Sequence, residues 1–500
     1  MTMQQKIEQF KAALKKMKAY QHAMGVMFYD FETVMPKGAA EDFAAHMGIL
    51  SEEVYKMQTA PEFKALIDEL YEKKDGLDLV TRREVEVLRE DSARTACIPM
   101  EEYVDYQKVQ SMASSVWHEA KVNNDYAAFK PYLKQLVDYN RKFALYYAPD
   151  KDPYDTMLDQ FEKGLTRKEL DGFFGNLREK LLPLINETSA RRDEIDDSFL
   201  FRHYPVEQQR AFSDYLMQVM GIDRNFCTIG EVEHPFTTNF TKHDVRITTH
   251  YYEDAVASSL YSVVHEGGHA LYELHTGDEL NDSPLGTGTS MGIHESQSRL
   301  FENIIGRSEE FTRLIFPKME ELFPEQLKGV TAWDFYRAVN KSVPSLIRTE
   351  ADELTYSFHI MVRYELEKQL IGGTLSVDDL PAAWNKLYKE YLGVDVPDDT
   401  HGVLQDSHWS GGSFGYFPSY AIGSAYGAQF MDAMRKDVDV DAVIRSGDLS
   451  PVVDWLTDKI YRFGMVKTPA QLIRDTCGAS FDPQFYVDYL TAKFTDIYGL

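Results

Sequence analysis

The sequence predicts a mostly helical fold with one small β-sheet, and three observations lead to this class. Apolar residues recur with the 3.6-residue period of an amphipathic helix in several long segments, as they do at Ile7, Phe10, Leu14, Met17 and Tyr20. β-Branched and aromatic residues with polar residues between them are confined to about 226–252. No repeat, low-complexity run or linker interrupts the chain. We therefore expect residues 1–500 to form a single domain, one large helical body.

Successive helices are predicted from residue 4 to about residue 150. Proline marks the breaks between them, which fall at 36–38, 98–99 and 149–153. Thr166 has the position of a helix N-cap, and the helix that it starts should run to about residue 190. Another helix is expected in the region 206–220, closed by Gly221.

The segment that follows predicts a small antiparallel sheet of two or three strands, at Phe226–Ile229, Phe236–Phe240 and Val245–Thr249. The edge of such a sheet can hold an extended peptide by main-chain hydrogen bonds. A short hairpin with only a structural role fits the same pattern equally well. Helices should resume at about residue 254 and continue to the end, interrupted by the Gly-, Ser- and aromatic-rich stretch 409–423.

Charge and cysteine content exclude several classes of protein. The net charge is −27, from 53 basic and 80 acidic residues, which argues against nucleic acid or an anionic membrane as partner. The three cysteines, Cys97, Cys227 and Cys477, are far apart and form no C-x-x-C pair, so a disulfide framework is not expected. The N-terminus has no apolar signal segment, and no later run is long and apolar enough to span a membrane. A cytoplasmic location is expected.

The segment His265-Glu266-Gly267-Gly268-His269 contains the pattern H-E-x-x-H within a predicted helix. Residues four apart lie on one face of a helix, so the two imidazoles can point at one metal ion. Two neutral imidazoles suit Zn²⁺, and Glu266 can act as general base for a water on the metal. The alternative is a solvated helix face that happens to carry two histidines. The adjacent glycines are costly in a helix, and close packing against another backbone would explain them.

A zinc hydrolase needs a third protein ligand, and Glu295 is the candidate. It follows His269 by 26 residues, which leaves room for a turn over 286–290 and a second helix. His294 is the competing candidate, because a chain can present either neighbour to the metal. Two imidazoles and one carboxylate accept Zn²⁺ or Co²⁺.

Two arginines could bind a substrate carboxylate. Arg246 lies on a predicted strand and Arg348 on a predicted helix, and the guanidinium group can grip a carboxylate with two parallel hydrogen bonds. For each arginine the alternative is an ordinary salt bridge, with Asp244 or Asp352 respectively.

Two further side chains could donate a hydrogen bond to a developing oxyanion, His408 and Tyr420. The alternative is simple packing of aromatic residues in a glycine-rich loop. Taken alone, His234 in the segment His234-Pro235-Phe236 marks a turn that enters the sheet.

Six short motifs in this order resemble the carboxypeptidase Taq family of zinc metallocarboxypeptidases, over essentially the whole chain. They are His234-Pro235-Phe236, Asp244-x-Arg246-x-Thr248, His265-Glu266-x-x-His269, His294-Glu295-Ser296-x-Ser298, Ile347-Arg348-x-x-Ala351-Asp352 and Gly402-x-x-Gln405-Asp406-x-His408-Trp409. The resemblance implies a mostly helical fold with a long substrate groove, related to neurolysin and angiotensin-converting enzyme. It also implies a homodimer that releases single C-terminal residues from peptides with broad specificity and accepts terminal proline poorly.

Carried over residue by residue, the resemblance assigns roles to most of the candidates. His265, His269 and Glu295 would bind the metal, and Glu266 would be the general base and acid. Arg348, with Arg246, would anchor the substrate carboxylate, and His234 belongs to a family motif that we expect to contact substrate. His408 and Tyr420 would polarise the scissile carbonyl. Apart from the resemblance, we expect buried polar residues to orient the imidazoles, with Asp352 and Glu302 as the candidates.

Two rival functions remain at the level of sequence. An oligopeptidase that cuts internal bonds is the nearer one, because the related folds include endopeptidases. The other is a metal-stabilised peptide-binding protein without catalysis. The intact Glu266 argues against the second, since a structural metal site has no use for a general base.

Overall fold

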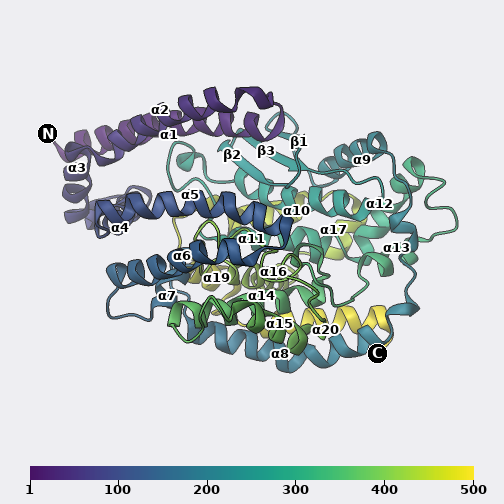
Figure 1. Cartoon of the computed structure of the whole chain (residues 1–500). Coiled ribbons are helices and arrows are strands. Elements are labelled where there is room, and N and C mark those ends of the chain that lie inside the picture. The colour runs from purple at the N-terminus through teal and green to yellow at the C-terminus, as the bar shows by residue number, and fades with distance from the viewer.

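Helices make up most of the computed structural model, which describes residues 1–500 (Figure 1). The helices are α1 (Met3–Thr33), α2 (Ala40–Thr59), α3 (Pro61–Glu72), α4 (Leu79–Ala96), α5 (Met100–Asn123), α6 (Tyr126–Tyr147), α7 (Pro153–Leu158), α8 (Arg167–Ala190), α9 (Val206–Val219), α10 (Val256–Leu274), α11 (Met291–Arg299), α12 (Glu309–Leu322), α13 (Ala332–Val339), α14 (Glu353–Gly372), α15 (Leu380–Leu392), α16 (Pro418–Met434), α17 (Val440–Ser446), α18 (Ser450–Lys459), α19 (Pro469–Cys477) and α20 (Gln484–Tyr498). None of these helices has both the length and the apolar composition needed to cross a membrane.

Local sequence signals explain where several helices begin and end. The Thr166 side chain accepts a hydrogen bond from the Glu169 amide, and Glu169 bonds back to the Thr166 amide, so α8 starts with a capping box. Helix α9 ends just before Gly221, whose φ of +74° suits glycine. Both helices are confirmed as predicted. The expected interruption over 409–423 is only partly right, because Pro418 occupies the first turn of α16 and starts that helix.

Three strands form the sheet, β1 (Cys227–Glu231), β2 (Thr237–Thr241) and β3 (Asp244–Thr249), in the order β1-β3-β2. The prediction of an antiparallel sheet is correct for β2 and β3 and wrong for β1, which pairs parallel to β3. The cause is the path of the chain. It leaves β1, crosses to the outer position of β2 and returns by a tight turn, so that β3 fills the centre of a mixed sheet.

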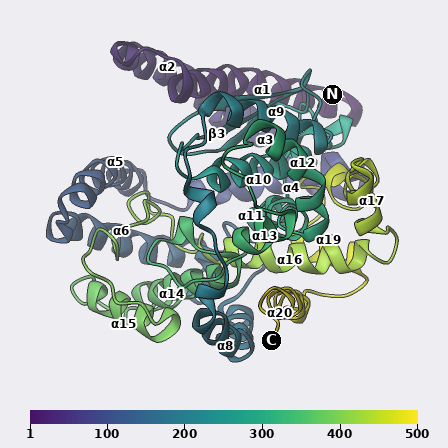
Figure 2. The ribbon, with the colours of Figure 1, turned by 90° about the vertical axis from the view of Figure 1, so that its right-hand side faces the viewer.

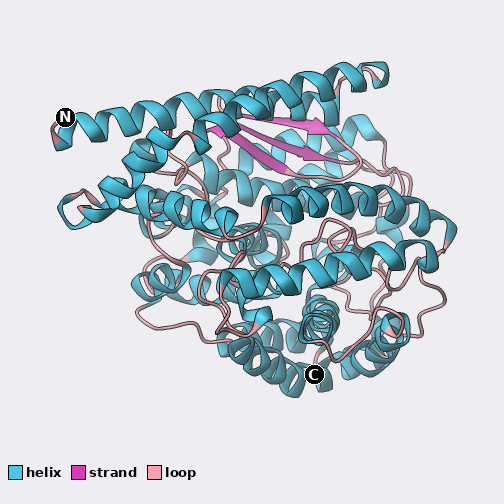
Figure 3. Cartoon of the chain, turned by 60° about the vertical axis from the view of Figure 1, so that its left-hand side comes forward, coloured by secondary structure: helices cyan, strands magenta, loops and turns pink.

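Helices cover both faces of this sheet. Figures 1 and 3 show α1 outside the strands, and α10 packs on their inner side. At Gly25 the backbone of α1 comes so close to β2 that an added Cβ would lie 2.7 Å from the Phe240 ring. The sheet therefore fixes α10 relative to the N-terminal helices.

Two hydrophobic clusters hold the helices together. The larger one contains 102 buried residues and extends from Val109 in α5 to Tyr498 in α20. The N-terminal helices have a separate cluster of nine buried residues, contributed by α1, α3, α4 and the connection that precedes α4. Figure 2 shows α1 and α2 on one side of the molecule and α8 and α20 on the opposite side.

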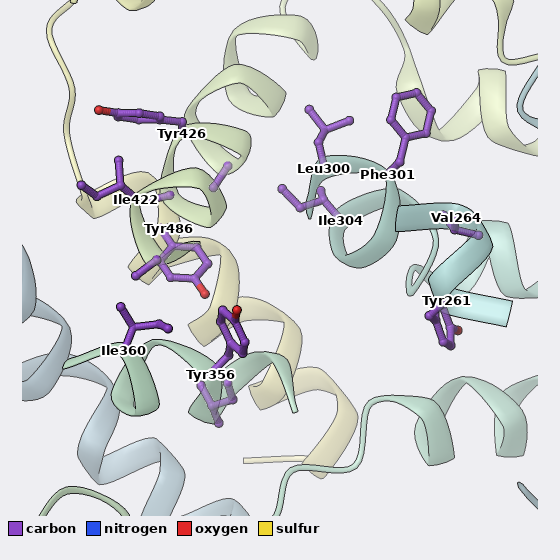
Figure 4. Packing of buried hydrophobic residues seen from close by; sticks show 14 of the residues in the cluster. Tyr261, Val264, Leu300, Phe301, Ile304, Tyr356, Ile360, Ile422, Tyr426 and Tyr486 are labelled. Carbon is purple, nitrogen blue, oxygen red and sulfur yellow. The ribbon is translucent and has the colours of Figure 1, made fainter. Parts of the chain in front are cut away.

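The larger cluster surrounds the junction of α10, α11 and a π-helical turn, Leu300–Ile305, that continues α11. Figure 4 shows apolar side chains of this turn together with those of α10, α14, α16 and α20, namely Leu300, Phe301, Ile304, Tyr261, Val264, Tyr356, Ile360, Ile422, Tyr426 and Tyr486. Single π turns inside helices are frequent at functional sites. The packing makes this junction a rigid support for whatever side chains it carries.

Candidate active site

Helices α10 and α11 cross with their backbones in contact at Gly268. A Cβ added there would lie 2.6 Å from the carbonyl oxygen of Gln297 and 2.8 Å from the Cα of Ser298. At Gly267 the added atom would instead meet the end of the Met220 side chain, at 2.7 Å. The expectation of close backbone packing is thus confirmed at Gly268. The contact brings α11 next to the histidines of α10.

His265, His269 and Glu295 converge at this crossing, and their ligating atoms all lie within 4.8 Å of one another. Glu295 Oε2 lies 3.7 Å from His265 Nε2 and 3.4 Å from His269 Nε2. Atoms bound at about 2.0–2.2 Å to a tetrahedral ion are separated by about 3.3–3.6 Å. The three donors therefore fit one divalent ion and leave a fourth position for water or substrate.

The first imidazole is oriented by a carboxylate on the π turn. Glu302 Oε2 lies 2.8 Å from His265 Nδ1 and also accepts from Arg299 at 3.2 Å. Burial alone would raise the pKa of Glu302, yet Arg299 and His265 lower it to about 2. The expectation that Glu302 contacts an imidazole is confirmed. The same expectation for Asp352 is wrong, because its carboxylate caps the N-terminus of α14 by accepting from the amides of Leu354 and Thr355.

The second imidazole contacts another histidine. His269 Nδ1 lies 2.5 Å from His294 Nδ1, and His294 Nε2 lies 2.6 Å from Glu273 Oε1. Both ring nitrogens of His294 are thereby occupied, so Glu295 and not His294 joins the two histidines of α10. Sequence reasoning missed Glu273, although its spacing of four from His269 places it one turn further along the same face.

Neighbouring residues fix Glu295 in place. Arg299 donates to Glu295 Oε1 at 2.7 Å, and the Ser298 hydroxyl donates to Oε2 at 3.0 Å. Burial would raise the pKa of Glu295, but Arg299 and His265 hold it well below its usual value, so the carboxylate is charged. Arg299 was also missed by sequence reasoning, although its i, i+4 spacing from Glu295 is a recognisable signal.

A buried carboxylate holds the start of α11. Glu162 is 2 % exposed, and its Oε2 accepts from the Gly292 amide at 3.0 Å. Burial raises the pKa of Glu162 to about 7, and its side-chain oxygen satisfies one of the free main-chain amides at the N-terminus of α11. No local pattern in the sequence connects Glu162 with residues 130 positions away, so only the structure reveals it.

Glu266 is buried beside His265 and contacts the sheet. The Thr237 hydroxyl donates to Glu266 Oε2 at 2.5 Å, and it also lies 3.1 Å from the Glu266 main-chain oxygen. Burial raises the pKa of Glu266. A carboxyl group with a raised pKa, next to a metal site, is suited to accepting and returning a proton.

A cavity of about 550 Å³ opens beside this group. Its wall contains His265, Glu266, Arg299, Arg348 and Tyr356, together with small residues of α10 such as Ala257 and Ser258. One member of the trio, His265, the buried Glu266 carboxyl group and one of the two candidate arginines, Arg348, thus border a single space. The full length of the groove implied by the resemblance stays an expectation.

Arg348 lies on a single 3₁₀ turn, Arg348–Glu350, in front of α14, so the expectation that it lies on a helix is wrong. Its Nε donates to Asp406 Oδ1 at 2.9 Å, its Nη1 donates to the Tyr356 hydroxyl at 3.1 Å, and its guanidinium lies 4.9 Å from the Tyr420 ring centre. Asp406 is therefore its salt-bridge partner, not Asp352. The Nη2 group makes no hydrogen bond within the protein and can bind an added carboxylate.

Arg246 is in a different situation. Its Nε and Nη2 groups donate to the two carboxylate oxygens of Asp244 at 2.9 Å, and its guanidinium lies 4.9 and 4.7 Å from the ring centres of Tyr29 and Phe240. It is not among the residues that border the cavity. His234 lies exposed on the turn between β1 and β2 and makes no side-chain hydrogen bond.

His408 and Tyr420 form a pair, with His408 Nε2 3.1 Å from the Tyr420 hydroxyl. Burial lowers the pKa of His408 to about 4, so the imidazole is neutral near pH 7. The expectation that Tyr420 lies in a loop is wrong, because it belongs to the first turn of α16. Three residues later, Gly423 brings α16 against Glu295, where an added Cβ would lie 2.8 Å from the Glu295 Cβ. Tyr420 therefore lies on a helix that packs directly against a member of the trio, and its contact with His408 holds that ring next to α16.

Comparison with known proteins agrees with this geometry. The model of the carboxypeptidase Taq (M32) metallopeptidases matches residues 9–494. The chain belongs to this family. Carboxypeptidase 1 of Bacillus subtilis is 40 % identical over 494 residues, covering 99 % of both proteins. Thermostable carboxypeptidase 1 of Thermus thermophilus is 37 % identical over 498 residues, covering 96 % of this chain and 97 % of the relative.

Solved structures from the M32 family share the whole fold. The M32 carboxypeptidase from Deinococcus radiodurans R1 superposes with a TM-score of 0.96 at 35 % identity, covering 99 % of this chain and all of the other. A carboxypeptidase from Pyrococcus furiosus gives a TM-score of 0.94 at 33 % identity, covering 98 % of this chain and 99 % of the other. This M32 protein is a metallocarboxypeptidase, and membership implies a divalent metal.

Proposed function

We propose that this enzyme releases single amino acids from the C-terminus of peptides and that Arg348 measures the distance to the chain end. The observation that carries the proposal is the position of Arg348, in the wall of the same cavity as His265 and Glu266. A carboxypeptidase must hold the terminal carboxylate about one residue away from the bond that it cuts. An arginine whose Nη2 group has no partner within the protein, in the wall of a cavity that His265 also borders, meets this need.

His265, His269 and Glu295 would hold the metal, which we take to be Zn²⁺, with Co²⁺ as a workable substitute. When bound, the ion would polarise the scissile carbonyl and lower the pKa of the attacking water. Glu266 would accept the proton of this water and then deliver it to the leaving amine. The burial that raises the pKa of Glu266 supports this role, because a moderately basic carboxylate can both take and return a proton.

His408 and Tyr420 would donate hydrogen bonds to the carbonyl oxygen as negative charge develops on it. Their support is the 3.1 Å contact between them and the packing of α16 on Glu295. The neutral state of His408 leaves one N–H group to share between Tyr420 and the substrate.

Of the two candidate arginines, we assign Arg348 to binding the C-terminal carboxylate of the substrate. Arg246 is held by Asp244 and two aromatic rings, so we assign it to bracing β3 against α1. His234 precedes the edge strand β2, and we propose that it contacts the part of the peptide that extends away from the scissile bond.

Broad specificity would follow from the cavity beside Arg348, which has a volume of about 550 Å³ and mixed walls. Its small residues leave room for side chains of different sizes. Terminal proline would be disfavoured because its scissile bond is a tertiary amide, which has no N–H group to donate and a ring that fixes the backbone.

A time course by mass spectrometry on one peptide, free and C-terminally amidated, tests the proposal. The free peptide should lose one residue at a time from its C-terminus, and the amidated peptide should resist. A chelator should stop the reaction, and added Zn²⁺ or Co²⁺ should restore it. Internal fragments from both peptides would instead establish an oligopeptidase and remove Arg348 from its role as anchor.

We also propose a homodimer in the cytoplasm. The absence of a disulfide among Cys97, Cys227 and Cys477 suits a reducing compartment. Light scattering should give twice the chain mass of 57.5 kDa. A mass equal to that of one chain would contradict the dimer.

A further inference from the structure

The two histidines of the proposed metal site are supported in different ways, and the support of His269 is the unusual one. We propose that His294, held by Glu273, is the positioning residue that fixes the tautomer and orientation of His269 for metal binding. This inference rests on the proposed metal-binding role of His265, His269 and Glu295. It concerns a residue that touches neither the metal position nor the substrate.

The hydrogen-bond directions along this chain have only one consistent arrangement. If His269 binds metal through Nε2, that nitrogen carries no proton, and the neutral ring carries its proton on Nδ1. His294 Nδ1 lies 2.5 Å from His269 Nδ1, so it must accept the hydrogen bond that the His269 N–H group donates. The proton of His294 is therefore on Nε2, which donates to Glu273 Oε1 at 2.6 Å. A carboxylate at the end of the chain thus sets the tautomers of two rings.

Glu273 is suited to be the fixed end of this chain. It is 3 % exposed and accepts hydrogen bonds from three different segments. Thr287 donates to Oε1 at 2.7 Å, and Asn239 in β2 donates to Oε2. His294 in α11 completes the set. Because all three side chains donate hydrogen bonds to the Glu273 carboxylate, this group acts only as an acceptor and cannot easily rotate away.

The ring of His294 is held by packing as well. Tyr272 stacks on it, with ring centres 5.3 Å apart and an interplanar angle of 27°. Gly288 also comes close to both rings, so that an added Cβ would lie 2.6 Å from His294 Cδ2 and 3.1 Å from Tyr272 Cε1. A ring clamped in this way keeps both of its nitrogens aligned with their partners.

His265 provides the comparison within the same site. Its Nδ1 contacts Glu302 directly, and that carboxylate is balanced by Arg299 and Arg307. Glu273 makes no salt bridge with a lysine or an arginine. Its charge acts on Lys18 without a direct ion pair, and the imidazole of His294 separates the Glu273 carboxylate from His269. His294 therefore orients His269 without placing a further negative charge directly on it.

Three substitutions of His294 separate the two contacts of its ring. The side-chain oxygen of asparagine can occupy the position of Nδ1, so His294→Asn keeps an acceptor for His269. The amide of glutamine reaches the position of Nε2, so His294→Gln keeps a partner for Glu273 and loses the acceptor for His269. His294→Phe keeps the stacking on Tyr272 and loses both contacts. His275→Asn is the matched control, because His275 lies at the end of α10, the helix that carries His269, and its side chain hydrogen-bonds only to the Leu271 carbonyl oxygen.

The readout is the Zn²⁺ affinity of the metal-free protein, measured by competition with a chelating dye. Loss of a partner that orients a ligand typically costs about 10–100-fold in metal affinity. We expect the Zn²⁺ affinity of His294→Phe and of His294→Gln to fall by this factor. For His294→Asn, the loss of binding free energy should be less than about a third as large. His275→Asn should bind like the parent. Equal affinities for the parent and His294→Phe, or equal losses for His294→Asn and His294→Gln, would overturn the inference.

A double-mutant cycle tests the link to Glu273. If both residues act in one chain, the variant that combines His294→Phe with Glu273→Leu should bind Zn²⁺ no more weakly than His294→Phe alone. Additive losses would overturn the link. Circular dichroism checks the fold of each variant. If His294→Phe does not fold, the comparison of His294→Asn with His294→Gln decides, because both preserve a polar side chain.

The absorption spectrum of the Co²⁺-loaded protein separates orientation from ligation. In His294→Asn the spectrum should match the parent, because no ligand is changed; an altered spectrum would make His294 a ligand and overturn the inference. None of these readouts requires peptide cleavage. A parent protein that binds Zn²⁺ tightly but releases no amino acid would refute the proposed function and still allow the role of His294 to be judged.

Discussion

At the scale of single residues, the site depends on a carboxyl group whose proton affinity is set by burial. Glu266 is 7 % exposed and has one direct hydrogen-bond donor from another element, the Thr237 hydroxyl. The imidazole of His265 favours the charged form, while burial favours the neutral form and dominates. Such a balance leaves the group able to change its protonation state during a reaction cycle.

Replacing Glu266 by glutamine keeps the shape of this side chain and removes its ability to take a proton. We expect kcat for a reporter peptide to fall by about 10²–10⁴-fold, the usual contribution of general acid–base catalysis. Bound Zn²⁺, measured by elemental analysis, should stay close to one ion per chain because the three ligands are unchanged. Retained activity with a full metal site would rule out this role of Glu266.

The two arginines make a matched pair for testing carboxylate recognition. Arg348→Lys keeps a positive charge but loses the planar fork, so we expect kcat/KM on free peptides to fall about 10–100-fold, mostly through KM. The corresponding Arg246→Lys change lies outside the cavity and should have a much smaller effect. Steady-state kinetics on free and amidated peptides measure both. The interpretation would fail if Arg246→Lys had the larger effect on KM.

At the scale of elements, the site is built by one helix crossing. The absence of a side chain at Gly268 lets α11 lie on α10, and this contact places Glu295 within reach of His265 and His269. The π turn after α11 then brings Glu302 to His265. Its Asn303 carbonyl oxygen is free of an ordinary helical partner and accepts from Tyr489 and Lys493 of α20, so the C-terminal helix braces this turn.

Gly268→Ala tests whether the crossing needs backbone contact. The added methyl group would meet main-chain atoms of Gln297 and Ser298, which cannot move aside as a side-chain end can. We expect a loss of about 1–3 kcal/mol in stability, seen as a lower thermal midpoint, together with weaker metal binding.

Gly267→Ala is the control for this change. Its methyl group meets the flexible end of Met220, and alanine gains about 1 kcal/mol of helix propensity over glycine, so the two effects largely offset each other. Equal thermal midpoints for the Gly268→Ala variant and the parent would show that the crossing tolerates a wider separation.

At the scale of the whole molecule, the metal site is carried by elements that are already packed. The 102-residue cluster surrounds α10, α11 and α16 independently of any ion. We propose that residues 1–500 act as a single catalytic domain, with α1, α3 and α4 attached through the sheet and through their own small cluster.

Metal removal should therefore abolish activity without unfolding the protein. We expect far-ultraviolet circular dichroism to be unchanged by a chelator, because the helices do not depend on the ion. The thermal midpoint should fall, because an ion that binds only the folded state stabilises it. Loss of helical signal in the chelator would show that the fold itself depends on the metal.

Most of the helices and the identity of the candidate trio could be predicted because both depend on local spacing. His265 and His269 share a face through the helical period alone, and Thr166 starts α8 through contacts within four residues. The pairing of β1 could not be predicted in this way. A parallel or antiparallel partner presents the same alternation along a strand, and only the path of the chain between strands decides between them.

The sequence by itself thus determined the helical class, the family motifs and the residue types of the candidate site. Only the tertiary structure decided that Glu295 and not His294 faces the two imidazoles, that Arg348 borders the cavity while Arg246 is held by Asp244, and that Thr237 contacts Glu266. The reason is physical. Spacing along the chain fixes geometry within one element, whereas contacts between elements depend on how closely their backbones can approach, as at Gly268 and Gly423.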